Sequence, residues 1–124
     1  GLMVTTKAVG AVGEARALAH LLAHGLVLVK RNYRVAAGPR ARGGEIDLVM
    51  RDRDGTLVFV EVRARKTAGF GGAAATVGVS KQRSLVFAAR CFLRSCATPP
   101  ACRFDVVAID GDHMEWLQAA FDAE

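Results

Sequence analysis

The stretch GGEIDLVMRDRDGTLVFVEVRARK, residues 43–66, decides how this chain folds. Both halves are rich in branched apolar residues that alternate with polar ones, and the Arg-Asp-Gly segment at 53–55 separates them. Such alternation on either side of a short glycine-containing loop is typical of a β-hairpin. We predict one strand over residues 45–51 and a second over residues 56–65.

The register of this hairpin follows from its apolar positions, because a slip of one residue would turn every side chain to the other face. A two-residue turn at Asp54-Gly55 would mix polar with apolar residues in every cross-strand pair. A three-residue loop that ends at Gly55 leaves one face wholly apolar, and glycine supplies the left-handed conformation that such a loop needs. The apolar pairs are then Ile46–Val62, Leu48–Val60 and Met50–Val58.

The opposite face of the hairpin collects carboxylates. In the same register Asp47 lies opposite Glu61, and Glu45 lies opposite Arg63. Paired carboxylates repel each other across a sheet, so a bound cation is expected to offset the repulsion. Carboxylate oxygens suit Mg²⁺ or Mn²⁺, which predicts a metal site formed by Glu45, Asp47 and Glu61, with the carbonyl of Val62 as a further ligand. The alternative is a solvated edge of ordinary cross-strand ion pairs, in which Arg63 partners the acids.

Basic residues flank the acids on both sides. Arg40 and Arg42 precede the hairpin, and Arg65 and Lys66 end it. These side chains could hold phosphate groups, while a metal ion polarises a phosphoryl oxygen and activates water. The chemistry that these residues indicate is metal-dependent hydrolysis of phosphodiester bonds.

The composition agrees with a basic globular domain. The 124 residues are 52% hydrophobic and 23% charged, which predicts a single domain spanning residues 1–124. The formal net charge of +5 invites an anionic partner, with nucleic acid first, although many basic proteins bind none. Three cysteines without CxxC spacing support neither a disulfide framework nor a zinc cluster. With no signal peptide and no apolar run of about 20 residues, we expect a cytoplasmic protein without a membrane partner.

The rest of the chain alternates between helical and strand patterns, which predicts an α/β fold of order α-β-β-β-α-β-β. Gly25 is placed to end the first helix, and Ser80 to cap the second. The predicted helices cover 6–24 and 81–95, and the predicted strands 26–34, 45–51, 56–65, 103–109 and a short 113–117.

Several segments match a known protein family. They are Gly13-Glu14, RNYR at 31–34, GEIDLV at 44–49, FVEVRAR at 59–65, FDVV at 104–107 and AAF at 119–121. Through these segments, which span nearly the whole chain, the sequence resembles the YraN family of restriction-endonuclease-like proteins. Its central part is also similar to the split D…ExK signature of the PD-(D/E)xK nuclease superfamily.

The resemblance implies a restriction-endonuclease-like mixed sheet flanked by helices. It implies that Asp47 and Glu61 are metal ligands, that Glu14 on the first helix is a further acid of the site, and that Glu45 is its neighbour. The activity implied is that of a Mg²⁺- or Mn²⁺-dependent endonuclease acting on DNA, branched or single-stranded forms included. A small nuclease that cuts both strands is expected to form a homodimer, although no sequence pattern marks a dimer face.

One departure from the signature concerns its third residue, which is usually lysine and here is Arg63. Arginine stays protonated, so it can stabilise charge but cannot act as a base. Lys66 and Lys81 are candidate substitutes, Lys81 being placed at the start of the second helix. Two alternatives to an active nuclease therefore remain: a nucleic-acid-binding module with a decayed catalytic centre, and an interaction protein that uses the fold as a scaffold.

Overall fold

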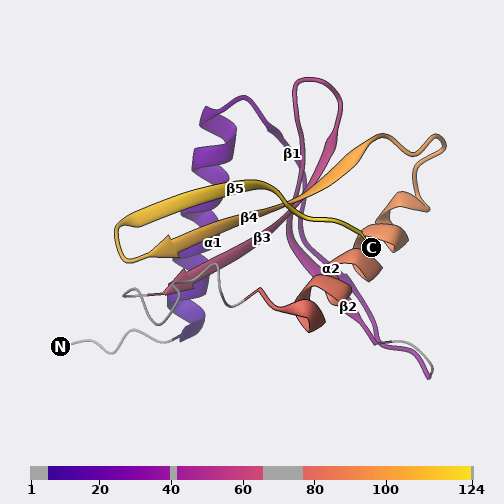
Figure 1. Ribbon diagram of the computed structural model, residues 1–124, viewed down its shortest axis with the longest axis horizontal. Helices are drawn as coiled ribbons and strands as arrows, with labels where there is room; N and C mark the ends of the chain where they lie inside the picture. The colour runs from indigo at the N-terminus through magenta and orange to yellow at the C-terminus, as the bar shows by residue number, and fades with distance from the viewer. Residues whose placement is uncertain (1–5, 40–41, 66–76, 124) are drawn as a thin grey trace.

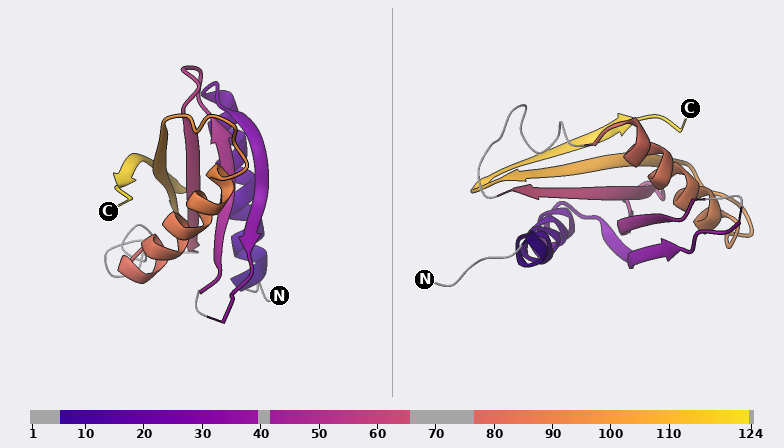
Figure 2. Two further views of the ribbon diagram at one scale, coloured as in Figure 1. Left: turned by 90° about the vertical axis from the view of Figure 1, so that its right-hand side faces the viewer. Right: turned by 90° about the horizontal axis from the view of Figure 1, so that it is seen from below.

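The computed structural model describes residues 6–39, 42–65 and 77–123. These residues form a five-stranded mixed sheet with one helix on each face (Figure 1, Figure 2). The sheet order is β1-β2-β3-β4-β5, in which β3 and β4 are parallel and the other neighbours antiparallel. The expected α/β class is confirmed. The elements are α1 Thr6–Ala23, β1 Val27–Val35, β2 Gly44–Arg51, β3 Leu57–Arg65, α2 Val79–Leu93, β4 Cys102–Asp110 and β5 His113–Phe121.

The helix ends follow the sequence signals at α1 but not at α2. Gly25, just after α1, has a φ of +91°, as expected of a glycine that ends a helix. The predicted cap at Ser80 is wrong, because α2 begins at Val79 and its N-cap is Gly78, which makes no side-chain hydrogen bond. Neither of the two described helices is long and apolar enough to cross a membrane.

The β2–β3 hairpin has the predicted register as far as the Leu48–Val60 pair, but the predicted pair Ile46–Val62 is not formed. Leu48 pairs with Val60 and Met50 with Val58. The loop contains three residues and is closed by backbone hydrogen bonds from Asp52 N to Thr56 O (2.9 Å) and from Gly55 N to Asp52 O (3.0 Å). Gly55 has a φ of +90°, the left-handed conformation that the loop requires.

The two hairpin strands separate at one point to form a fork. Within β2 and β3, both fully described, the ladder runs from the Arg51–Leu57 pair to the Leu48–Val60 pair and goes no further. Past this point β2 stays paired with β1 only, and β3 with β4 only. Figure 1 shows β2 and β3 running apart from there. Asp47 and Glu61 are the first residues beyond the last pair, so the fork is where their side chains meet.

The core has two layers, and one residue lies in a different layer from the one predicted. Leu48 and Met50 pack with α1, as their shared face requires, but Ile46 packs in the cluster that faces α2. Strict alternation is broken because β1, the partner of this part of β2, has a register shift after Leu28 and a φ of +50° at Asn32. Such irregularities increase the local twist of a strand pair.

Helix α2 approaches β2 closely at Gly44. A Cβ built on Gly44 would lie 2.5 Å from the backbone oxygen of Ser84, a distance that real Cβ atoms do not reach. Glycine at this position therefore allows the first turns of α2 to lie against β2, beside the fork.

Candidate metal centre at the strand fork

The acid pair Asp47 and Glu61 bridges the two strands at the fork. Asp47 Oδ2 accepts a hydrogen bond from the backbone N–H of Val62 at 2.8 Å, so a side chain links β2 to β3 where the backbone ladder has ended. The two carboxyl groups also lie close enough for the Asp47 charge to raise the pKa of Glu61. Glu61 is only 3% exposed. The fork thus holds two acids in contact and largely away from water.

Burial changes the protonation of this pair. Burial, and then the Asp47 carboxylate, raise the pKa of Glu61 to about 8. Burial also raises the pKa of Asp47, although the hydrogen bond from Val62 partly offsets the effect. One proton is therefore held between the two acids at neutral pH, as is usual for two carboxyl groups that share a site.

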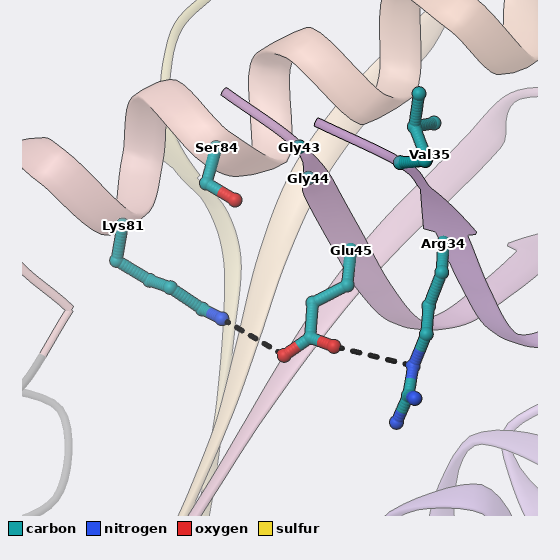
Figure 3. Close-up of a pocket in the computed structure, with 8 residues that line it drawn as sticks. Arg34, Val35, Gly43, Gly44, Glu45, Lys81 and Ser84 are labelled. Carbon is teal, nitrogen blue, oxygen red and sulfur yellow. Dashed lines mark ion pairs between the residues drawn. The ribbon is translucent and has the colours of Figure 1, made fainter. Parts of the chain in front are cut away.

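Three basic side chains surround the acids. Lys81 Nζ lies 3.6 Å from Glu45 Oε1 and 3.7 Å from Glu61 Oε2. Arg63 Nε lies 3.5 Å from Glu61 Oε1, and Arg34 Nε lies 3.4 Å from Glu45 Oε2. In Figure 3, Lys81 and Arg34 approach Glu45 from opposite sides. These contacts are longer than the 2.7–2.9 Å or so of a strong charge-assisted hydrogen bond, so they balance charge without fixing the acids tightly.

Helix α1 brings Glu14 to the same cluster. A Cβ on Gly13 would lie 2.5 Å from Cβ of Ala64, so glycine permits α1 to lie close to β3. Burial, and then the nearby Asp47 carboxylate, raise the pKa of Glu14. Its Oε1 atom is buried and has no hydrogen-bond partner in the described part of the chain. The resemblance had singled out Glu14, and the structure places it within electrostatic reach of the acid pair.

The acids suit a hard divalent cation. In the part of the chain that the structure describes, no three His, Cys, Asp or Glu side chains are arranged to hold one ion together, so Glu45 stays a predicted ligand. Mg²⁺ needs only one or two carboxylates, its other ligands being water and phosphate oxygens. The Asp47–Glu61 pair meets this need. The buried Oε2 of Glu61 accepts no hydrogen bond from a described residue, so a metal ion would supply the partner that it lacks.

The predicted basic residues are not all placed at the fork. Arg42 is exposed beside Gly43, just before β2 begins. Arg65 is the last residue of β3 and lies opposite Asp110 of β4. Arg40 and Lys66 lie outside the described residues. The structure therefore brings together Glu14, Glu45, Asp47, Glu61, Arg63 and Lys81.

Sequence reasoning missed Arg34 as a site residue. Arg34 is the cross-strand partner of Glu45 in the antiparallel β1–β2 ladder. Opposite charges at directly paired positions stabilise a sheet, so this signal was present in the sequence. Finding it required the β1–β2 register, which the irregular strand β1 obscures.

A groove adjoins the acid cluster. It has a volume of about 580 Å³ and lies between α2 and the ends of β1 and β2 that face it (Figure 3). Its walls combine basic side chains, a hydroxyl group and glycine backbone. The lining includes Arg34, Gly43, Gly44, Glu45, Lys81 and Ser84.

Together, the fold and the site define an α/β protein with a buried acid pair at a strand fork and basic residues around it. The model of the uncharacterised protein family UPF0102 matches residues 13–109, and the chain belongs to this family. It is 71% identical over 121 residues to a UPF0102 protein of Methylibium petroleiphilum, covering 98% of this chain and 99% of that relative. It is 59% identical over 119 residues to a UPF0102 protein of an Acidovorax species, covering 96% and 88%. No solved structure matches the chain.

Proposed function

We propose that this protein is a Mg²⁺- or Mn²⁺-dependent endonuclease that hydrolyses phosphodiester bonds in nucleic acid, with DNA as the foremost substrate. The Asp47–Glu61 pair carries the proposal. Two acids in contact, one of them with its pKa raised to about 8, destabilise a fold, and such perturbed groups cluster at functional sites. The similarity of GEIDLV and FVEVRAR to the PD-(D/E)xK signature, and of the chain to restriction-endonuclease-like proteins, supports the same reading.

The proposal gives each residue of the fork a role. Asp47 and Glu61 hold the ion, which supplies a Lewis acid that polarises a phosphoryl oxygen and activates water. Glu14 has a buried oxygen without a hydrogen-bond partner among the described residues, and this oxygen accepts a hydrogen bond from a water molecule at the site. Arg63 beside Glu61 stabilises the negative charge that develops on the phosphate.

A cleavage assay with Asp47→Asn tests this proposal. Single-stranded, duplex and branched DNA, each end-labelled, is incubated with Mg²⁺, Mn²⁺ or a chelator. We expect cleavage by the wild type with either metal and none with the chelator. Asp47→Asn should lose more than about a hundredfold in rate, because removal of a ligand weakens both the binding and the orientation of the ion.

The matched control is Asp112→Asn, in the exposed turn between β4 and β5. It removes the same charge away from the fork and should cut like the wild type. Equal cleavage by Asp47→Asn and Asp112→Asn would contradict the proposal.

Arg63 supports a second candidate, a nucleic-acid-binding module without turnover. Arg63 stands where the signature has lysine and lies 3.5 Å from Glu61, and arginine cannot exchange a proton at neutral pH. Under this reading the protein binds DNA in a salt-sensitive way and yields no product.

The variant Arg63→Lys separates the two candidates. If the protein is an active nuclease, the variant should stay within about tenfold of the wild-type rate, because the positive charge beside Glu61 is kept. If the centre has decayed, the wild type is inactive, and restored lysine should create measurable metal-dependent cleavage.

A further inference from the structure

Lys81 occupies a position that helix stability does not explain. It lies in the first turn of α2, where no acidic residue is present and the N-cap Gly78 makes no side-chain hydrogen bond. A cation near a helix N-terminus is unfavourable, because the helix dipole is positive at that end. A residue that breaks a local rule in this way is expected to serve another purpose.

The contacts of Lys81 indicate that purpose. Its Nζ lies between two acids from different strands, 3.6 Å from Glu45 and 3.7 Å from Glu61. Glu61 Oε2 nevertheless has no hydrogen-bond partner among the residues that the structure describes. Arg34 Nε lies 3.4 Å from the other oxygen of Glu45, Oε2. Both cations therefore balance the charge of the acids at a distance, as counter-ions that could be exchanged.

The groove offers the two cations another anionic partner. Lys81 and Arg34 both line it, together with the hydroxyl-bearing Ser84 and the glycine backbone at 43–44 (Figure 3). The absence of a Cβ at Gly43 and Gly44 lets Val35 and Ser84 lie close to this segment, which keeps the groove narrow there. Two cations and a hydroxyl group suit a phosphodiester group.

We propose that Lys81 and Arg34 are exchangeable counter-ions of the site. In the metal-free protein they balance the negative charge of Glu45 and of the Asp47–Glu61 pair; when a divalent cation binds the acids, they turn to a backbone phosphate of a nucleic-acid strand in the groove. A dication at the fork repels the ammonium group of Lys81, while a phosphate in the groove attracts it. The inference rests on the proposed function and adds the place and the residues that hold the strand.

Exchange of this kind makes the metal ion and the nucleic acid bind cooperatively. The metal ion releases the cations that the nucleic acid binds, and the nucleic acid captures the cations that compete with the metal ion. It also gives Lys81 opposite effects on the two ligands. Removal of its charge should help the metal ion, which no longer competes with an ammonium group, and should harm the nucleic acid, which loses a phosphate contact. A lysine with only a structural role would not separate the two affinities.

The test measures both affinities in Lys81→Met, which keeps the unbranched stem and removes the charge. Binding of Mn²⁺ alone is followed by calorimetry. Binding of a fluorescein-labelled single-stranded oligonucleotide is followed by anisotropy in Ca²⁺, another hard oxygen-binding cation. We expect Mn²⁺ to bind about tenfold more tightly and the oligonucleotide about tenfold more weakly. Arg34→Met, at a more exposed side chain, should show the same two signs with smaller changes.

The matched control is Arg83→Met, an exposed position on α2 two residues further on. It should change Mn²⁺ affinity less than twofold. The inference is overturned if Lys81→Met and Arg34→Met bind Mn²⁺ no more tightly than Arg83→Met, or if both bind the oligonucleotide like the wild type. If the wild type binds Mn²⁺ and cleaves DNA, and Lys81→Met has the same affinities as the wild type, this inference alone is overturned. A wild type that binds no Mn²⁺ overturns the proposed function as well.

Discussion

Two acids are buried among the residues that the structure describes, and their surroundings differ. Asp105 on β4 is 1% exposed and Glu61 on β3 is 3% exposed. Both oxygens of Asp105 accept hydrogen bonds from Arg103 Nε, at 3.1 and 3.2 Å. Trp116 Nε1 donates to Oδ2 at 3.0 Å, and the backbone N–H of Ala119 donates to Oδ1 at 2.9 Å. Asp105 is thus fully satisfied by the fold itself.

Glu61 is left incomplete by the fold. Among the described residues its Oε2 has no hydrogen-bond partner and its nearest cations lie at 3.5 and 3.7 Å, while the charge of Asp47 raises its pKa. Buried charges that serve structure are normally satisfied, and an unsatisfied one demands an explanation. The contrast indicates that Asp105 stabilises the sheet, whereas the acids at the fork serve to bind a ligand.

Substitution of Asp47 should give the largest effect, and this effect should be on the cleavage rate and not on stability. Asp47→Asn is expected to lower metal-dependent cleavage more than about a hundredfold, because a ligand of the ion is lost. Its free energy of unfolding, measured with urea, should stay near the wild-type value, because like-charge repulsion at the fork is relieved as the hydrogen bond to Val62 weakens. A large loss of stability would place Asp47 in the same class as Asp105.

Substitution of Asp105 should have the converse effect. Asp105→Asn is expected to cost about 3 kcal/mol in the free energy of unfolding, because it removes the buried carboxylate that pairs with Arg103 Nε and leaves Arg103 paired with the partly exposed Asp52. The cleavage rate per folded molecule should not change. Urea unfolding and a rate normalised to the folded fraction measure the two quantities, and a specific loss of activity would break the contrast.

Glu61 should also make the stability of the protein depend on pH. With its pKa raised from 4.5 to about 8, Glu61 is protonated in the folded state and ionised in the unfolded state between these values. The folded state then binds more protons, so stability falls as pH rises from about 5 to 8.

The variant Glu61→Gln isolates this contribution. It should remove much of the decline and stabilise the metal-free protein at pH 8 by about 2 kcal/mol, of the order that a shift of this size allows. Thermal unfolding in chelator at several pH values measures it. An unchanged decline in the variant would show that Glu61 does not hold the proton.

The last comparison concerns stability alone and tests the close packing of α2 on β2, which brings Lys81 to the fork. Gly44→Ala should destabilise the protein by about 2 kcal/mol, because its Cβ would meet the backbone of α2 at 2.5 Å and force the helix outward. Gly10→Ala on α1, where a Cβ meets nothing within 4 Å, should instead stabilise it by up to about 1 kcal/mol. Urea unfolding of both variants provides the comparison, and equal effects would contradict the close approach.

The hairpin could be predicted because its signals are local. Apolar alternation and Gly55 were enough to fix a register that the structure confirms from Arg51–Leu57 to Leu48–Val60, although the strands separate before the predicted Asp47–Glu61 pair. What failed depends on contacts between distant segments. Ile46 turns toward α2 because of irregularities in β1, and the last strand runs on to Phe121 rather than stopping at 117.

The site was predicted in part for the same reason. Acids on one hairpin face can be found from alternation alone, whereas Glu14 was reached only through the resemblance. The place of Lys81 depends on how α2 docks on Gly44, and that of Arg34 on the β1–β2 ladder. No short-range pattern encodes either contact. The Asp105 network was invisible too, since it joins residues from β4 and β5 through the bulge at Ala119.

One measurement tests the central claim, that the fork is a metal site, most directly. Mn²⁺ is titrated into the wild type and Asp47→Asn by calorimetry at pH 7, in two buffers with different heats of ionisation. We predict that the wild type binds Mn²⁺ and releases about one proton, the one held by Glu61 and Asp47, because carboxylate ligands must be deprotonated. Asp47→Asn should bind far more weakly. Absence of binding by the wild type, or binding with no proton release that persists in the variant, would contradict the account.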